Sequence, residues 1–237
     1  MVESLDLTKL DSPTIDCTTY QRAIGSLMYA MICTHPDIAY STGLLAQHAA
    51  NPGDEHWMAI KRELRYLQGT RDLGITYSQS KLAKLVGYVD ADYAGDKNSS
   101  RSTSGWVFLM AGGPVAWSSC KQLTISLSST EAEYVAAAST TRELVWLRQF
   151  ISELGFLPDG PTTLLTDNQS SIALARNPVN HRSTKHIRVK YHFIREMITL
   201  RKIDLRYIPT EKQVADVLTK PLGRIKFPGF IGDMNMS

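Results

Sequence analysis

Four separated carboxylates are the residues of this chain that could carry out chemistry together. Asp90 ends an apolar run, Glu133 lies early in a helical run, Asp167 follows a second apolar run, and Asp216 lies in a short helical run near the C-terminus. Clustered carboxylates repel one another, so a site that gathers them normally binds hard divalent cations. The pattern indicates metal-assisted phosphodiester chemistry, provided that folding brings the four acids within a few ångströms of one another.

Each acid taken alone has an ordinary structural interpretation. Asp90 shares one strand face with Val86 and Tyr88, and it could simply cap the loop that follows. Asp167 could be the N-cap of the next helix. Asp216 could be a surface helix acid, although it borders an apolar face. The set of four favours a shared site, whereas no single member decides the question.

Two glutamates lie at the start of the same predicted helix, and their spacing gives them different roles. Ser128 and Glu131 match the S-x-x-E capping box, in which the glutamate folds back onto the first turn. At about 100° per residue, Glu133 lies on the apolar face of the helix and Glu131 about 200° away from it. That apolar face consists of Ala137, Leu144, Leu147 and Ile151. We therefore expect Glu133 to point toward the sheet and Asp90.

The elements that must position these acids can be read from hydrophobic periodicity and turn residues. Strands are predicted over 85–90, 105–110, 115–117, 123–127, 163–166 and 203–208, and helices over 129–154, 169–176, 185–200 and 212–219. The first 80 residues are predicted to be mainly helical, with a short strand over 73–77. This order predicts an α/β, mixed α+β fold, in which helices flank a mixed sheet. The polar stretch 78–81 is the expected boundary between a helical segment, 1–80, and the sheet domain, 81–237.

Charge is distributed unevenly along the 237 residues. The formal net charge is only +3, but residues 176–226 contain thirteen Lys or Arg and four Asp or Glu. An excess of positive charge in one region suggests a polyanionic partner, and a solvated basic surface without a partner is the simpler alternative.

Other bulk features bear on the compartment. Three cysteines without C-x-x-C spacing suggest reduced thiols and an intracellular protein, in the cytoplasm, the nucleus or a virus-like particle. The polar N-terminus does not resemble a secretory signal. No uncharged apolar run reaches 18 residues, so we expect no membrane span.

Several motifs, in this order, resemble the ribonuclease H region of copia-type retrotransposon polyproteins. They are GYVDADYAGD at 87–96, STSG at 102–105, LSSTEAEY at 127–134, TDNQS at 166–170 and VADVLTKPL at 214–222. Earlier segments, YQRAIGSLMY at 20–29, PDIAY at 36–40 and LRYLQGT at 64–70, are similar to the thumb or connection region that joins the polymerase to ribonuclease H. The resemblance covers nearly the whole chain, and the motifs are specific only as a set.

The resemblance implies a ribonuclease H-like, five-stranded mixed sheet flanked by helices and preceded by a small, mainly helical segment. It implies a catalytic and metal-binding set of Asp90, Glu133, Asp167 and Asp216 that holds two Mg²⁺ ions, with Mn²⁺ as a possible substitute. In this scheme Asp90 bridges both ions, Glu133 and Asp167 support one of them, and Asp216 supports the other. The implied activity is cleavage of the RNA strand of RNA/DNA hybrids.

Further residues are candidates for substrate contacts. Predicted nucleic-acid contacts are Ser129, Asn168, Lys185, Arg188, Lys190 and Arg195. Asp92, His186 and Glu211 are possible auxiliary residues; Glu211 occupies the place where retroviral relatives have a mobile histidine. We expect no membrane partner.

The resemblance also leaves alternatives open. No Asp-Asp dipeptide is present, so the polymerase active site is expected in the remainder of the polyprotein and not in this chain. One alternative is a non-catalytic, nucleic-acid-binding remnant of a retrotransposon. Another is an integrase or transposase core, against which the VADVLTKPL match argues.

Overall fold

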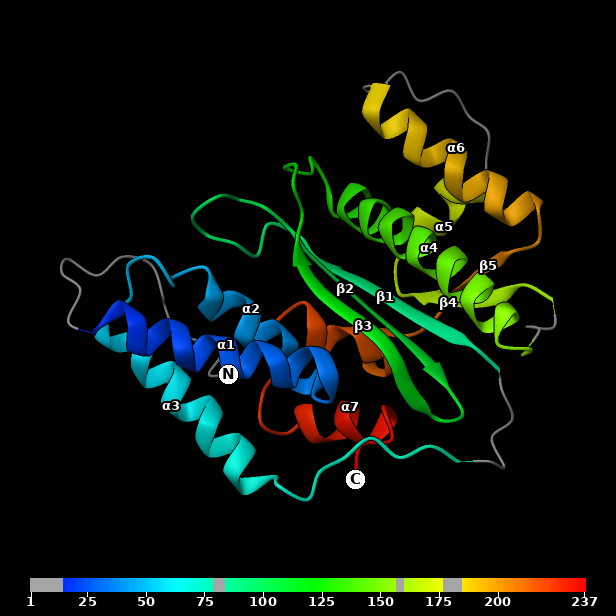
Figure 1. Cartoon of the computed structure of the whole chain (residues 1–237). Helices are drawn as coiled ribbons and strands as arrows, with labels where there is room; N and C mark the ends of the chain where they lie inside the picture. Colours follow the sequence, from blue (N-terminus) through cyan, green and yellow to red (C-terminus); the bar gives the residue numbers. More distant parts are fainter. Residues whose placement is uncertain (1–14, 79–83, 157–159, 177–184) are drawn as a thin grey trace.

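The computed structural model describes residues 15–78, 84–156, 160–176 and 185–237, and only the backbone of residues 185–191. It contains a five-stranded sheet of order β3-β2-β1-β4-β5 with helices on both faces (Figure 1). The strands are β1 (Val86–Asp92), β2 (Thr103–Met110), β3 (Gly113–Lys121), β4 (Thr162–Thr166) and β5 (Ile203–Tyr207). Strands β1, β2 and β3 pair antiparallel, whereas β4 pairs parallel with β1 and with β5. The predicted mixed, ribonuclease H-like sheet is therefore confirmed.

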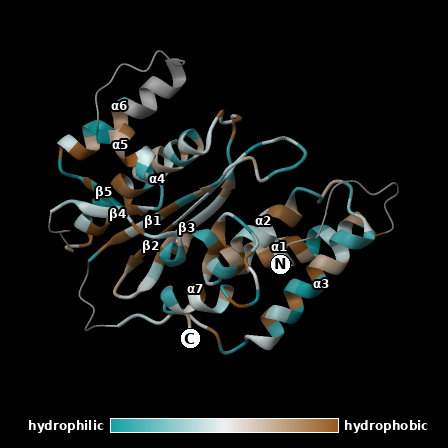
Figure 2. Cartoon of the chain, turned by 180° about the vertical axis from the view of Figure 1, so that it is seen from behind, coloured by the Kyte–Doolittle hydropathy of each residue, from teal (hydrophilic) through white to brown (hydrophobic). Residues whose placement is uncertain are grey.

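The helices divide between the two faces of the sheet (Figures 1 and 2). The α-helices are α1 (Cys17–Cys33), α2 (Ala39–Ala46), α3 (Asp54–Gly69), α4 (Ser129–Glu153), α5 (Gln169–Arg176), α6 (Lys185–Thr199) and α7 (Phe227–Asp233). Short 3₁₀ helices are η1 (Pro36–Ile38), η2 (Thr210–Lys212) and η3 (Val214–Leu218). Helices α4, α5 and α6 cover one face, and η3 and α7 lie on the other. No helix among the described residues has the length and apolar character needed to cross a membrane.

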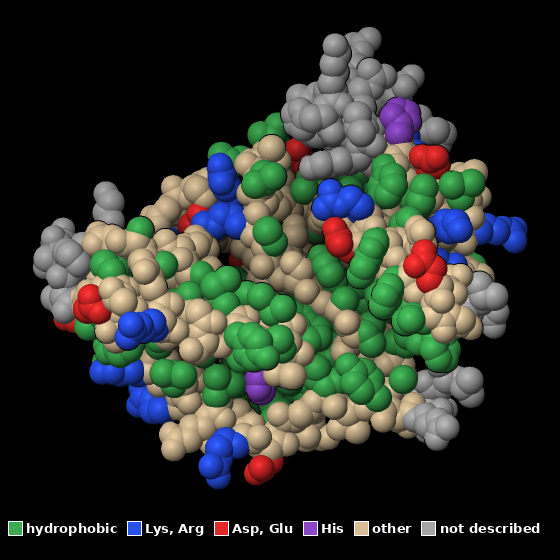
Figure 3. All heavy atoms as spheres, in the orientation of Figure 1, with side chains coloured by type: hydrophobic (Ala, Val, Ile, Leu, Met, Phe, Trp, Pro, Cys, Tyr) green, Lys and Arg blue, Asp and Glu red, His purple; other side chains and the backbone are tan. Residues whose placement is uncertain are grey.

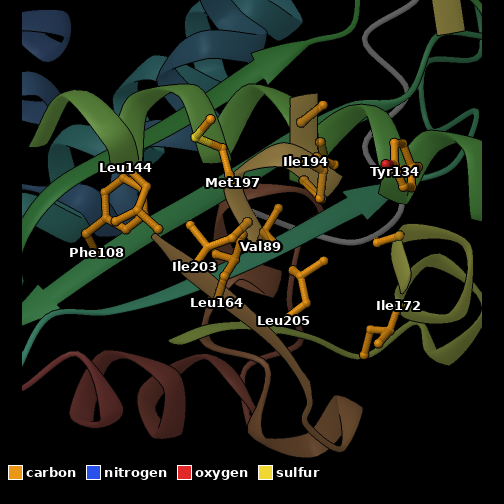
Figure 4. Close-up of a cluster of buried hydrophobic side chains, with 14 of the residues drawn as sticks. Val89, Phe108, Tyr134, Leu144, Leu164, Ile172, Ile194, Met197, Ile203 and Leu205 are labelled. Atoms are coloured by element: carbon orange, nitrogen blue, oxygen red, sulfur yellow. The ribbon is translucent and has the colours of Figure 1, made fainter. Parts of the chain in front are cut away.

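Alternation along the strands supplies side chains to two separate cores. Val89 and Phe108 point toward α4, where they pack with Leu144 and with Leu164 of β4 (Figure 4). Their strand neighbours Tyr88 and Val107 point to the opposite face, against η3 and α7. Asp90 follows the alternation of Tyr88. Its side chain is therefore expected near the end of β1 on the face that η3 covers.

The second core also involves residues from both predicted parts of the chain. Met31 and Ile75 pack against it from the first 80 residues, and Ile75 forms an isolated bridge with Met236. A third cluster lies among α1, α2 and α3, around Tyr20 and Ile60. The expected boundary at 78–81 lies mostly outside the described residues.

Three element predictions are wrong, and a buried side chain explains the first of them. Residues 123–127 form a loop instead of a strand, because the amide of Gln122 donates to the Ala132 carbonyl (2.9 Å) and its Oε1 accepts from Ser126 (3.0 Å). The predicted helix 212–219 is replaced by the 3₁₀ helices η2 and η3. The predicted strand 73–77 is reduced to the single bridge of Ile75. Helix α7 was not predicted.

Gly105 lies directly opposite Asp90 in the β1–β2 pair, and the close approach of η3 requires a glycine there. An added Cβ would lie 2.6 Å from Thr219 Cγ2 and 2.8 Å from Leu218 Cβ. We expect Gly105→Ala to lower the free energy of unfolding by about 1–3 kcal/mol, as overpacking does, measured by urea denaturation. Gly25→Ala is the control, because nothing lies within 4 Å of its added Cβ. Equal stability of Gly105→Ala and the parent would contradict this packing.

Candidate metal centre

Asp90 is the central acid of the candidate site and is buried at the end of β1, with 3% of its surface exposed. The Thr219 hydroxyl donates a hydrogen bond to Asp90 Oδ2. Thr219 follows η3, so the layer opposite α4 helps to orient this carboxylate.

Glu133 approaches from α4 on the other face of the sheet. Its Oε1 accepts a hydrogen bond from the Ala91 backbone N–H (3.3 Å), and its buried Oε2 has no hydrogen-bond partner among the described residues. Glu131 has the separate role that its spacing predicts. Ser128 Oγ accepts from the Glu131 N–H (3.1 Å), and Glu131 Oε2 accepts from the Leu127 N–H (2.8 Å). The helix start is thus capped locally, and Glu133 is directed inward.

Asp167 follows β4, the parallel neighbour of β1, and completes a three-acid group. Its Oδ2 accepts a hydrogen bond from the Thr210 hydroxyl (2.7 Å). The cap of α5 is Asn168, whose Oδ1 accepts from the Ser171 N–H (2.8 Å), so Asp167 does not need to serve as the cap. Carboxylate oxygens of Asp90, Glu133 and Asp167 all lie within 4.8 Å of one another.

Asp216 reaches the site from η3 and approaches Asp90 from the other side of the sheet. It does not belong to the group that shares the 4.8 Å limit. Its carboxylate is buried, and Lys220 Nζ lies 3.0 Å from its Oδ1 and 3.8 Å from Asp90 Oδ2. The structure therefore divides the four predicted acids into a three-carboxylate group and an Asp90–Asp216 pair, with Asp90 common to both.

The electrostatics of the site oppose full ionisation. Burial, reinforced by the charges of Asp90 and Asp167, raises the pKa of Glu133 well above its usual range. Burial and the charge of Asp90 likewise raise the pKa of Asp216. Burial alone would lower the pKa of Lys220, but the charges of Asp90 and Asp216 outweigh it and raise that pKa.

These observations are compatible with a bound divalent cation. Three converging carboxylates supply hard oxygen ligands, and Glu133 Oε2 is a buried acceptor without a hydrogen-bond partner in the described part of the chain. A cation would offset the repulsion that raises the pKa of Glu133. Mg²⁺ and Mn²⁺ both suit a site made of such oxygen ligands.

Gln213 fixes η3, and thereby Asp216, against the sheet. It is fully buried, its amide donates to the Val89 carbonyl (2.9 Å), and its Oε1 accepts from the Ala215 N–H (3.3 Å). Gln213→Ala removes both of these hydrogen bonds. We expect it to lower the free energy of unfolding by about 1–3 kcal/mol, measured by chemical denaturation. The exposed Gln169→Ala is the control, and an equally small effect of both variants would contradict this role.

The residues predicted to contact nucleic acid differ in exposure and in hydrogen bonding. Ser129 is exposed at the first position of α4, whereas Asn168 is engaged as the cap of α5. Arg195 is partly buried and donates a hydrogen bond to the Leu174 carbonyl (3.0 Å), which links α6 to α5. The side chains of Lys185, His186, Arg188 and Lys190 lie outside the described residues.

Two of the possible auxiliary residues, Asp92 and Glu211, lie in different environments. Asp92 is half-buried beside the site, where burial is the main cause that raises its pKa and the charge of Asp90 adds to it. Glu211 is exposed on η2, and its neighbour Thr210 makes the contact with Asp167.

Sequence reasoning missed four residues of the site: Thr210, Gln213, Thr219 and Lys220. A usable signal for two of them was the VADVLTKPL motif, which contains Thr219 and Lys220 directly after the segment of Asp216. The spacing of Asp216 and Lys220 is also the i, i+4 spacing at which opposite charges meet on a helix.

Comparisons with curated proteins find similarity to transposon polyproteins and to a secreted effector protein. No protein-family model matches the chain. It is 45% identical over 208 residues to the retrovirus-related Pol polyprotein from transposon TNT 1-94 of Nicotiana tabacum, covering 88% of this chain and 16% of that polyprotein. It is 41% identical over 223 residues to the corresponding polyprotein from transposon RE2 of Arabidopsis thaliana, covering 94% and 15% respectively. Secreted RxLR effector protein 161 of Plasmopara viticola is 52% identical over 128 residues, 54% of this chain and 90% of that protein.

Solved structures provide a comparison of the fold. The foamy viral protease-reverse transcriptase dRH in complex with double-stranded DNA matches with a TM-score of 0.52 and 13% identity, over 86% of this chain and 33% of that chain. LC11-RNase H1 in complex with an RNA/DNA hybrid matches with a TM-score of 0.43 and 21% identity, over 57% and 94% respectively. The chain thus spans about one sixth of the plant polyproteins that it matches.

Proposed function

The chain belongs to the retrovirus-related Pol polyproteins of copia-type transposons, and from this premise we propose that it is a metal-dependent ribonuclease H. Its substrate would be the RNA strand of RNA/DNA hybrids. The observation that carries the proposal is the group of carboxylate oxygens of Asp90, Glu133 and Asp167, all within 4.8 Å of one another. This group is formed by β1, α4 and β4, and a fourth acid, Asp216, is held beside Asp90.

The residues of the chain would act by holding cations and setting the orientation of their ligands. Two Mg²⁺ ions, or Mn²⁺ in their place, would supply an activated water and stabilise the leaving 3′ oxygen when bound. Glu133 and Asp167 would hold one ion, Asp216 would hold the other, and Asp90 would take part in both. Hydrogen bonds keep these ligands in place: from the Ala91 N–H to Glu133, and from Thr210 to Asp167. The Thr219 hydroxyl holds Asp90 in the same way.

Substrate binding would rest on phosphate contacts and on the 2′-hydroxyls that distinguish RNA from DNA. Ser129 is exposed at the start of α4, one turn before Glu133, and is therefore a candidate for a contact near the cleaved bond. Arg224 and Lys226 are exposed basic residues beyond η3. On the face shown in Figure 3, Lys and Arg side chains are scattered among other residues and do not form one continuous patch. Because the chain spans about one sixth of the plant polyproteins that it matches, tight duplex binding would depend also on the remainder of the polyprotein.

Cleavage of a 5′-labelled RNA strand by the purified chain tests the proposal. With Mg²⁺ we expect cleavage of the RNA in an RNA/DNA hybrid, leaving 5′-phosphate and 3′-hydroxyl ends, and no cleavage in EDTA. Duplex RNA, duplex DNA and single-stranded RNA of the same sequence are the comparison substrates. Binding of the hybrid without cleavage, at Mg²⁺ and Mn²⁺ concentrations up to the millimolar range, would support the alternative of a non-catalytic binding remnant.

A further inference from the structure

Lys220 is the feature of the site that the two-cation scheme leaves without a role. Its ammonium lies 3.0 Å from Asp216 Oδ1 and 3.8 Å from Asp90 Oδ2. Both carboxylates are almost completely buried, with side-chain exposures of 5% and 4%, whereas the Lys220 side chain is 33% exposed. A buried carboxylate pair of this kind needs a positive charge nearby.

Among the residues that the structure describes, the positive charge close to the four acids comes from one side chain, Lys220. In the described part of the chain, Lys220 is the basic side chain within 4.0 Å of any of the four acids. Two buried carboxylate oxygens of the site, Glu133 Oε2 and Asp216 Oδ1, have no hydrogen-bond partner among the described residues, and of the two it is Asp216 Oδ1 that lies 3.0 Å from the Lys220 ammonium. The ammonium therefore offsets part of the charge of the Asp90–Asp216 pair, whereas Glu133 and Asp167 have no basic side chain within 4.0 Å in the described part of the chain.

From this arrangement we infer that Lys220 is a built-in counter-ion that competes with a divalent cation for the Asp90–Asp216 pair. The inference rests on the proposed function, since it concerns how the same site acquires its cations. An ammonium and a divalent ion bound to the same two carboxylates would repel each other strongly at such short range. Binding of a cation by this pair would therefore require the lysine to withdraw.

The fold gives the side chain room to withdraw. Lys220 also lines a cavity of about 420 Å³ between the α2–α3 region and the segment that follows η3. Tyr40, Leu222 and Phe227 are among the other residues on its wall. Since the lysine stem is long and flexible, its ammonium can leave the carboxylates without movement of the backbone. Lys220 is thus a positioning residue that governs cation affinity.

Lys220→Met removes the ammonium and keeps much of the apolar stem, so it is the informative variant. We expect it to bind Mn²⁺ at least about 10-fold more tightly than the parent chain, measured by isothermal titration calorimetry, by comparison with the 10–100-fold effects of residues beside metal ligands. We expect it to unfold at a lower temperature than the parent in EDTA, and this difference to shrink or reverse in Mn²⁺. A merely structural lysine would lower stability equally in both conditions.

Two further variants complete the experiment. Lys202→Met removes an exposed positive charge outside the site and should leave Mn²⁺ affinity unchanged. Lys220→Arg retains the charge and should keep the affinity for Mn²⁺ within about 3-fold of the parent. This variant also provides a measurement if Lys220→Met does not fold. In that case a Lys220→Arg chain that gains affinity would overturn the inference.

The result for the parent chain separates the two proposals. Mn²⁺ binding by the parent with equal or weaker binding by Lys220→Met would overturn the role of Lys220 and leave the proposed function standing. Absence of Mn²⁺ binding by the parent and by Lys220→Met would overturn both.

Discussion

Asp90→Asn should reduce cleavage of the RNA strand in a hybrid by more than about 100-fold at saturating Mg²⁺. The expected loss is large because Asp90 is shared by the three-carboxylate group and by the Asp90–Asp216 pair, so the substitution weakens both. Even residues that only orient metal ligands commonly contribute 10–100-fold to affinity or activity. Initial rates on a fixed hybrid, measured over a range of Mg²⁺ concentrations, give the comparison.

Asp72→Asn is the matched control, since it makes the same chemical change at an exposed position outside the site. It should retain the parent rate. The unfolding transition of Asp90→Asn should show that the variant is folded, because Asn is close to Asp in shape. If Asp90→Asn cut the hybrid at a rate within a few fold of the parent, the assignment of Asp90 as a shared ligand would be wrong.

Glu133→Gln should stabilise the metal-free protein while it removes the stabilisation that Mg²⁺ confers. Burial and the charges of Asp90 and Asp167 raise the pKa of Glu133 above its ordinary value of 4.5, so the folded state holds this proton more strongly than the unfolded state. Its contribution to stability is therefore complete below about pH 4.5 and is lost as the pH rises through the folded-state pKa. At pH 8 in EDTA we expect a gain of about 1–3 kcal/mol for the variant, since one pKa unit corresponds to about 1.4 kcal/mol.

Urea denaturation between pH 5 and pH 8.5, with EDTA and with Mg²⁺, measures this effect. In EDTA the parent should lose stability with rising pH more steeply than Glu133→Gln, and Mg²⁺ should stabilise the parent far more than the variant. Glu196→Gln, at an exposed position of α6, should follow the parent in both conditions. A parent whose stability did not depend on Mg²⁺, or a variant less stable than the parent at pH 8 in EDTA, would show that Glu133 is not an uncompensated buried carboxylate.

Local rules were sufficient to predict much of the three-carboxylate group. The capping box assigned Glu131 to the helix start, and helical periodicity directed Glu133 inward, as the structure shows. Strand alternation placed Asp90 on the face of Tyr88. The parallel pairing of β1 and β4 then brings the residue after β4, Asp167, to the same edge of the sheet.

The position of Asp216 could not be derived in this way. It depends on the contact of Gln213 with Val89, two residues separated by 124 positions in the sequence. That contact holds a pair of short 3₁₀ helices where periodicity predicted one continuous helix. The ammonium of Lys220 enters the site as a consequence, so its role also depends on tertiary structure.

The environment of Arg195 shows a different limit of prediction from sequence, although its role as a nucleic-acid contact stays a prediction. A run of basic residues on one predicted helix suggested a duplex-binding face, but periodicity does not say which of them faces a neighbouring helix. Arg195 donates to the carbonyl of Leu174 in α5, which tertiary packing determines. The loop 123–127 shows the same limit, because its alternating pattern is that of a strand and its actual path is set by the buried Gln122.

An anomalous difference map from a crystal of the chain grown with Mn²⁺ would test the metal centre most directly. The account predicts a peak within ligand distance of carboxylate oxygens of Asp90, Glu133 and Asp167. A well-ordered site without a peak at saturating Mn²⁺, or peaks only on other acids of the surface, would contradict it.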